Sequence, residues 1–254
     1  MNDTEIVHLK DCLKGKDLDK YEIPICLGRT NNGEILIKDF ADIHNLLISG
    51  ATCSGKSVFL NSVINTILLT KTPKEVQLLL IDFKQAEFHF YKDIPHLKYP
   101  VIYDVEEAVY ALGRIFNERD NNKEESYPDI VIVLEDYADF IQLERIHSNL
   151  FQDLRHWIMH ILLYGNTLGI YTVLSSSKIS DNNLLVRIRE SIPNRLVGYL
   201  PTSEDSIIML GQEGAEKLLG SGDMIYRNIK SGETERVQTP YISTNETEKI
   251  IKKF

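Results

Sequence analysis

Continuous apolar runs alternate with amphipathic stretches along most of the chain. Four runs lack the alternation of a half-exposed strand and predict strands covered on both faces: VQLLLID (76–82), DIVIVLED (129–136), GIYTVLSS (169–176) and NRLVGYL (194–200). Longer stretches between them have helical periodicity, notably 105–120 and 148–169. Strands that alternate with helices predict a mainly parallel sheet with right-handed crossovers, and so a three-layer α/β domain.

A glycine- and asparagine-rich turn near the N-terminus separates two further apolar stretches. The turn TNNG (30–33) is flanked by EIPICLG (22–28) and GEILIKDF (33–40), a pattern typical of a hairpin. We therefore expect a short N-terminal β-hairpin extension that packs on the α/β core.

Composition and charge narrow the class of protein. The chain has 254 residues, of which 43% are hydrophobic and 26% charged, so it can bury a large core. No apolar run reaches the roughly 18 to 20 residues that cross a bilayer, and we expect a cytoplasmic protein. Because Cys12, Cys26 and Cys53 lie far apart, neither a zinc site nor a disulfide framework is expected. The formal net charge of −9 argues against a broadly basic surface, so any contact with nucleic acid has to be local.

The stretch LLISGATCSGKS (46–57) is the strongest chemical motif. It fits G-x-x-x-x-G-K-[ST] and lies between an apolar strand and the amphipathic helix KSVFLNSVINTILLT. Backbone N–H groups of such a loop wrap phosphates, the lysine reaches the β- and γ-phosphates, and the final hydroxyl ligates Mg²⁺. The predicted ATP and Mg²⁺ site consists of Gly50, Ala51, Thr52, Cys53, Ser54, Gly55, Lys56 and Ser57.

Several other segments make the motif more specific. The stretches LLLIDFKQAEFHFYKDIPHL, IVIVLEDYADF, GIYTVLSSSK, IPNRLVGY and GAEKLLGSGDMIY follow the glycine loop in this order. In this the chain resembles the motor domain of the FtsK/SpoIIIE family of hexameric DNA translocases over nearly its whole length. The resemblance implies a P-loop, RecA-like core that assembles into a ring, with ATP between neighbouring subunits and double-stranded DNA in the central pore.

The resemblance also divides the chain into three parts. Residues 1–45 would form the hairpin extension, residues 46–240 the FtsK-like P-loop ATPase domain, and residues 241–254 a C-terminal tail. Membrane spans and the winged-helix module of full-length translocases are not found here, so we do not expect sequence-directed movement.

The acidic pair that ends the apolar run DIVIVLED departs from the family order. The family carries Asp-Glu, in which Asp holds the metal through water and Glu polarises the attacking water, whereas this chain carries Glu135-Asp136. By resemblance, Glu135 becomes the metal-side carboxylate together with Ser57, and Asp136 the water-side carboxylate. The exchange moves each carboxylate by an ångström or more, and about 1 Å of misplacement can cost roughly a hundredfold in rate. We expect hydrolysis that is slow or conditional; the alternative is that backbone adjustment absorbs the exchange.

Two further positions matter for hydrolysis. Ser177 stands where the family carries a glutamine that senses the γ-phosphate, and serine is too short to reach as far. The resemblance makes Arg195 the candidate arginine finger, acting on the neighbour's nucleotide; the alternative is an ordinary salt-bridging arginine at a strand start.

Candidate contacts with DNA lie in SKISDNNLLVRIRES, a polar and loop-like stretch. Lys178, Arg187 and Arg189 could follow phosphates in a ring pore, although each on its own could equally be a solvated surface cation.

Two alternatives to a DNA motor remain open. The chain could be an ATP-binding module with little turnover that organises an assembly, or an ATPase similar to those of type VII secretion that moves protein.

Overall fold

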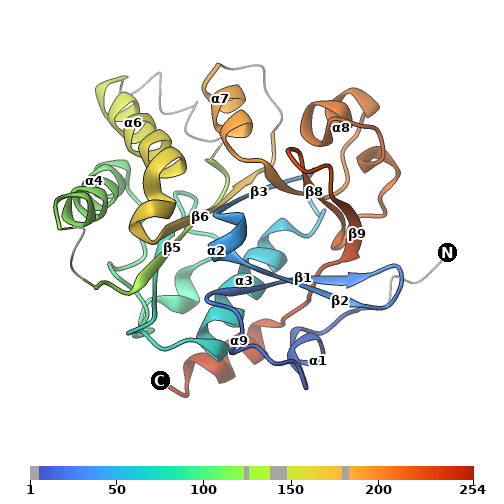
Figure 1. Ribbon diagram of the computed structural model, residues 1–254, viewed down its shortest axis with the longest axis horizontal. Coiled ribbons are helices and arrows are strands. Elements are labelled where there is room, and N and C mark those ends of the chain that lie inside the picture. Colours follow the sequence, from blue (N-terminus) through green and yellow to red (C-terminus); the bar gives the residue numbers. More distant parts are fainter. Residues whose placement is uncertain (1–5, 123–125, 138–147, 179–182) are drawn as a thin grey trace.

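Nine strands form one mixed sheet in the computed structural model, which describes residues 6–122, 126–137, 148–178 and 183–254 (Figure 1). The order in the sheet is β2-β1-β9-β8-β7-β3-β6-β5-β4. The strands are β1 (Pro24–Thr30), β2 (Ile35–Asp39), β3 (Asn45–Ser49), β4 (Val76–Ile81), β5 (Asp129–Leu134), β6 (Ile170–Ser176), β7 (Asn194–Val197), β8 (Asp223–Asn228) and β9 (Thr234–Gln238).

The helices are α1 (Leu9–Leu13), α2 (Phe40–Ile43), α3 (Lys56–Thr70), α4 (Val105–Asn121), α6 (Ser148–Tyr164), α7 (Asn183–Ser191), α8 (Ser203–Leu210) and α9 (Thr244–Ile251). Three of the helices, α3, α4 and α6, lie in stretches whose periodicity predicts a helix. Local side-chain caps fix several helix starts. The Asp104 side chain accepts from the N–H groups of Glu106 and Glu107 at the start of α4, and Ser243 and Glu246 form a capping box at α9.

Five neighbouring strands, β7-β3-β6-β5-β4, are parallel, as the continuous apolar runs predict. All five residues of β3 and all seven of β6 are buried, because helices cover both faces. Strand β7 ends at Val197, directly before Gly198, and is therefore shorter than the apolar run NRLVGYL that predicted it. The predicted three-layer α/β core of a P-loop ATPase is therefore confirmed for these five strands and the helices that cover them.

The other half of the sheet is antiparallel, and the N-terminal hairpin belongs to it. Strands β1 and β2 pair across the predicted turn, where Gly33 has a φ of 85°. Strand β1 also pairs with β9, which pairs with β8, which pairs with β7. The hairpin thus extends the main sheet by hydrogen bonding, and Ile25, Cys26 and Leu27 of β1 also pack in the core.

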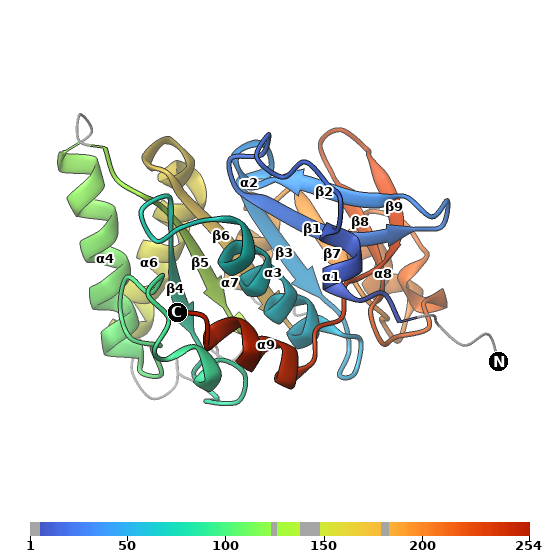
Figure 2. The same cartoon turned by 90° about the horizontal axis from the view of Figure 1, so that it is seen from below.

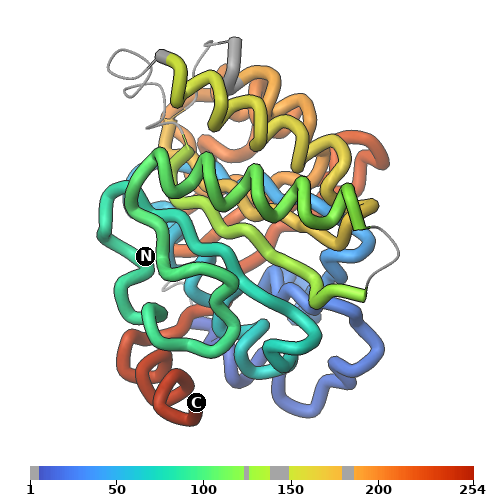
Figure 3. Tube along the Cα trace, turned by 90° about the vertical axis from the view of Figure 1, so that its left-hand side faces the viewer, coloured from blue at the N-terminus to red at the C-terminus, as the bar shows by residue number. Residues whose placement is uncertain are grey.

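Two apolar clusters lie on the two faces of the sheet. One joins the sheet to α1, α3 and α9, and the other joins it to α4, α6, α7 and α8. Figure 3 shows α4 and α6 on one side of the strands and α9 on the other. Side chains alternate between the clusters along a strand: Leu46 and Ile48 face the first and Leu47 the second. The predicted face of α3 is buried as a whole: Phe59, Leu60, Val63, Ile64, Ile67 and Leu68.

The stretch predicted to be loop-like after β6 contains helix α7, and its residues 179–182 lie outside the described residues.

Within the described part of the chain, every helix is too short or too polar to span a bilayer.

Candidate nucleotide-binding site

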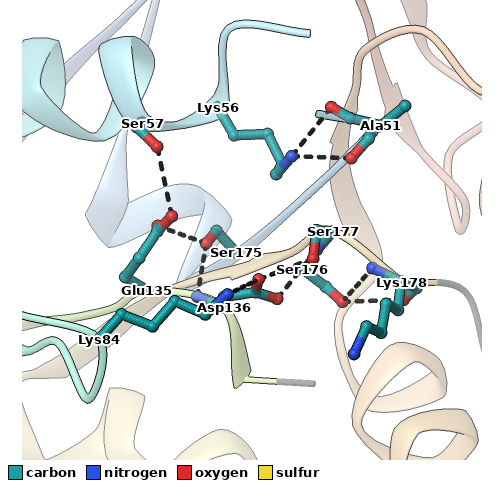
Figure 4. A network of polar contacts seen from close by, with 11 residues as sticks. Ala51, Lys56, Ser57, Lys84, Glu135, Asp136, Ser175, Ser176, Ser177 and Lys178 are labelled. Carbon is teal, nitrogen blue, oxygen red and sulfur yellow. Dashed lines mark hydrogen bonds and ion pairs between the residues drawn. The ribbon is translucent and has the colours of Figure 1, made fainter. Parts of the chain in front are cut away.

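The glycine loop lies at the carboxyl edge of the parallel strands. Strand β3 ends at Ser49, the loop 50–55 follows, and α3 begins at Lys56. Residues that come directly after β5 and β6 reach the same edge, as parallel strands require. Together with the segments 221–222 and 238–241 they line a cavity of about 600 Å³. Figure 4 shows the polar contacts at the phosphate end of this cavity.

Backbone geometry makes the loop concave. Gly50 and Gly55 have φ values of 151° and 104°, and Cys53, which is exposed, also has a positive φ of 64°. At Gly55 a Cβ would lie 2.6 Å from the backbone nitrogen of Gly222, so no larger residue fits there. The buried Ser54 and the N–H of Ala51, which donates to the carbonyl of Tyr199 at 2.8 Å, fix the loop against β7. Contacts within the chain therefore hold the loop in this concave shape.

Lys56 lies inside this cradle. Its ammonium donates to the carbonyl oxygens of Gly50 (2.8 Å) and Ala51 (3.1 Å), and the residue is buried. Burial lowers the pKa of Lys56, and the nearby carboxylates of Glu135 and Asp136 oppose the shift. Phosphate oxygens are better partners for a partly desolvated ammonium than two carbonyls, so the side chain suits an anionic ligand.

Ser57 faces Glu135, the carboxylate expected on the metal side. The Ser57 hydroxyl donates to Oε1 of Glu135 at 3.3 Å, and the Ser175 hydroxyl donates to Oε2 at 2.6 Å. Burial raises the pKa of Glu135 to about 7, while the bond from Ser175 lowers it. A hydroxyl and a carboxylate are the oxygen ligands that Mg²⁺ prefers, and a cation here would favour the ionised carboxylate. The residues present therefore fit a magnesium ion held by Ser57 and Glu135.

Asp136 is held in place from several sides. Oδ2 of Asp136 accepts from the ammonium of Lys84 and the hydroxyl of Ser177, both within 2.8 Å, and Oδ1 accepts from the Ser177 N–H at 3.0 Å. Its own N–H donates to Ser175 at 2.8 Å, and its φ is 47°. Burial pushes the pKa of Asp136 up, but the bonds from Lys84 and Ser177 outweigh this, and the pKa lies below its usual value. Asp136 is thus an ionised carboxylate with a fixed direction.

The structure gives Ser177 and Lys178 separate surroundings. Ser177 lines the cavity and bonds to Asp136, so it reaches the acidic pair directly. Lys178 is exposed, and its carbonyl accepts from the Ser176 hydroxyl at 2.8 Å. Arg187 on α7 is also exposed, whereas Arg189 is half-buried and its carbonyl accepts from Arg195.

Arg195 makes its hydrogen bonds within its own chain. It is buried, and its guanidinium donates to the carbonyl oxygens of Met209 (2.6 Å), Arg189 (2.9 Å) and Ile192 (3.3 Å) of the same chain. Burial lowers the pKa of Arg195 to about 10. Within the chain the guanidinium is thus a structural clamp between β7 and the ends of α7 and α8, and its action as an arginine finger stays a prediction.

Two parts of the site were missed by sequence reasoning. Ser175 binds both members of the acidic pair, but a serine in an apolar strand carries no distinctive signal. The segment GSGD also contacts the glycine loop, since Ser221 donates to the carbonyl of Cys53 (3.2 Å) and Gly222 to that of Ser54 (2.9 Å). This segment supported the family resemblance, yet nothing in its residue types indicated that it packs against the loop.

Together, the loop, the lysine and the serine–carboxylate pair at the edge of a parallel sheet define a P-loop ATPase. A model of the FtsK/SpoIIIE family matches residues 8–167. The DNA translocase FtsK of Borreliella burgdorferi is 32% identical over 98% of this chain and 35% of its own length, and that of Treponema pallidum is 34% identical over 92% and 31%. The chain belongs to the FtsK/SpoIIIE family, and it spans about a third of the length of these relatives.

Solved structures support the fold. A conjugation coupling protein TcpA, determined with ATPγS, aligns with a TM-score of 0.79 and 19% identity over 97% of this chain and 73% of its own. The type VII secretion ATPase EccC of Thermomonospora curvata aligns with a TM-score of 0.73 and 18% identity over 91% and 31%. At these identities the likeness concerns the fold alone.

Proposed function

We propose that this chain is a motor domain that couples hydrolysis of Mg-ATP to movement of double-stranded DNA. In this proposal it works in the cytoplasm as a ring, with double-stranded DNA in the central pore and ATP bound between neighbouring subunits.

 The observation that carries the proposal is the combination of two facts: Lys56, Ser57 and Glu135 meet in one cavity, and relatives named DNA translocases match nearly the whole chain at 30% identity or more.

Each residue of the site has a role in this proposal. The loop N–H groups and Lys56 bind and orient the triphosphate, and Ser57 and Glu135 hold the magnesium ion. When bound, the ion supplies positive charge that neutralises the phosphates as the bond to the γ-phosphate breaks. Asp136 lies next along the chain, and Lys84 and Ser177 fix its direction. It is the group we assign to orient the attacking water.

Steady-state hydrolysis of Mg-ATP, with and without long duplex DNA, tests the proposal. A Lys56→Ala variant provides the blank, because it lacks the amine that reaches the phosphates. We expect DNA to stimulate turnover well above this blank. If ATP binds but DNA leaves its hydrolysis unchanged, the chain is not a DNA-driven motor.

A second candidate function is an ATP-binding module with low turnover. The observation that favours it is that both oxygens of Asp136 already accept hydrogen bonds, from Lys84 and Ser177. A carboxylate held in this way can orient water only through its remaining lone pairs. Nucleotide binding would then organise an assembly, and hydrolysis would be slow.

Restoring the family order of the acidic pair separates the two functions. In the double variant Glu135→Asp, Asp136→Glu, the water-side carboxylate is one methylene longer and reaches beyond Ser177. We expect turnover to rise, by up to about a hundredfold if misplacement is what limits the rate. An Asp136→Asn variant is the control, since it keeps the shape and removes the charge. An unchanged or lower rate in the double variant would remove the order of the pair from the explanation.

A further inference from the structure

The nucleotide cavity continues past the phosphate cradle to a wall formed by both ends of the described chain. Its lining there consists of Ile6 and Val7 from the N-terminal segment and Pro240 and Tyr241 from the segment before α9. Ile6 is 61% exposed and Tyr241 38% exposed, so neither side chain is used to fill the core. We call these four residues the terminal wall. Figure 2 shows the segment that leads into α9 running beside α1.

Backbone hydrogen bonds hold the two halves of the terminal wall together. The N–H of Tyr241 donates to the carbonyl of Val7 at 2.7 Å, and the N–H of Leu9 donates to the carbonyl of Tyr241 at 2.9 Å. The ring of His8 meets the ring of Tyr241 edge-on, with centroids 5.8 Å apart. These contacts fix the two segments of the terminal wall relative to each other.

A second set of bonds fixes the terminal wall relative to the glycine loop. The N–H of Thr239 donates to the carbonyl of Gly222 at 2.8 Å, and the amide of Gln238 donates to the carbonyl of Ser221 at 2.9 Å. Ser221 and Gly222 in turn donate to the carbonyls of the glycine loop. The phosphate cradle and the apolar wall are thus parts of one hydrogen-bonded frame around a single cavity.

A nucleoside triphosphate has the matching polarity: an anionic end and a flat, largely apolar base. The phosphate end belongs in the cradle of Lys56 and Ser57, so the base has to lie elsewhere along the same cavity. Exposed apolar side chains on a cavity wall are typical of sites that bind ring systems, and aromatic side chains stack on nucleobases. We infer that the terminal wall binds the nucleobase of ATP, with the ring of Tyr241 as its stacking surface. This inference rests on the proposed function, because it assumes that the ligand is a nucleotide.

Binding measurements with two ligands test the inference. Calorimetric titrations with Mg-ATPγS and with Mg-tripolyphosphate, which has no base, are compared for the unmodified chain and for Tyr241→Ala. We expect Tyr241→Ala to weaken ATPγS by about tenfold and tripolyphosphate by less than twofold, because only the base touches the wall. Tyr110→Ala is the matched control, since Tyr110 is an exposed tyrosine on α4. It should change neither affinity.

A fluorescence experiment gives an independent readout. The chain has one tryptophan, Trp157 on α6, so Tyr241→Trp adds a reporter in the cavity against a known background. ATPγS should change the emission of the new tryptophan, and tripolyphosphate should not. The inference is overturned if Tyr241→Ala binds ATPγS normally, or if it loses both ligands equally. Failure of the motor proposal looks different: ATPγS binds with a contribution from Tyr241, but DNA leaves hydrolysis unchanged.

Discussion

At the scale of single residues, one buried hydroxyl organises the acidic pair. Ser175 donates to Glu135 and accepts from the N–H of Asp136, so the two carboxylates share one support. We expect Ser175→Ala to lower the free energy of unfolding by about 1–3 kcal/mol, because a buried N–H loses its acceptor. Turnover should fall as well, since Glu135 loses the donor that directs it toward Ser57. Urea unfolding and steady-state hydrolysis measure the two effects.

The neighbouring serine provides the control for this prediction. Ser176 is also buried at the end of β6, but its hydroxyl donates to the carbonyl of Lys178. Ser176→Ala should therefore cost stability with a smaller effect on turnover. If both variants lose turnover in proportion to their loss of stability, Ser175 has only a structural role.

At the scale of elements, the contact between the segment GSGD and the glycine loop can be tested with two glycines. Gly222 and Gly232 have similar φ values of 90° and 79°. A Cβ at Gly222 would lie 2.6 Å from the Thr239 hydroxyl, whereas one at Gly232 would meet nothing within 4 Å. Gly232→Ala should cost about 1–2 kcal/mol of backbone strain, and Gly222→Ala should cost more and weaken ATP binding. Equal losses of unfolding free energy and of ATP affinity in the two variants would contradict the role of this contact.

Arg195 links three elements, and its replacement should act on folding. We expect Arg195→Ala to lower the free energy of unfolding by at least about 1–3 kcal/mol, because buried carbonyls at the ends of α7 and α8 lose their donor. The exposed Arg187 on α7 offers a control, and Arg187→Ala should leave the stability nearly unchanged. Mixing Arg195→Ala with Lys56→Ala subunits should recover no hydrolysis. Recovered hydrolysis would instead support the arginine-finger prediction.

The elements that were predicted from the sequence are those with a local signal. The apolar runs of β4, β5 and β6 and the buried face of α3 follow from their own periodicity, and the glycine loop follows from its motif. Pairings between distant segments have no such signal. The bond from Lys84 to Asp136 spans 52 residues, and the pairing of β1 with β9 depends on which edge is free in the folded chain. Arg195 could not be placed because its acceptors are backbone carbonyls, which every residue carries.

At the scale of the whole molecule, the net charge of −9 sets a condition for binding DNA. A chain with this charge repels a polyanion at long range, so attraction has to come from a few cations close to the phosphates. The proposed ring would bring together one copy of each cation from every subunit. Contact with DNA should therefore depend on assembly and fall steeply with salt.

The exposed Arg187 on α7 is the cation best suited to test this condition, because α7 comes after β6, the strand that ends directly before Ser177. Arg187→Ala should raise the DNA concentration needed for half of the maximal stimulation of hydrolysis, and it should make that concentration less dependent on salt, since fewer counterions are released. Arg155, an exposed arginine on α6, provides the matched control. If Arg187→Ala and Arg155→Ala respond alike at every salt concentration, α7 does not contact the phosphates, and the proposed ring would have to hold DNA along another face.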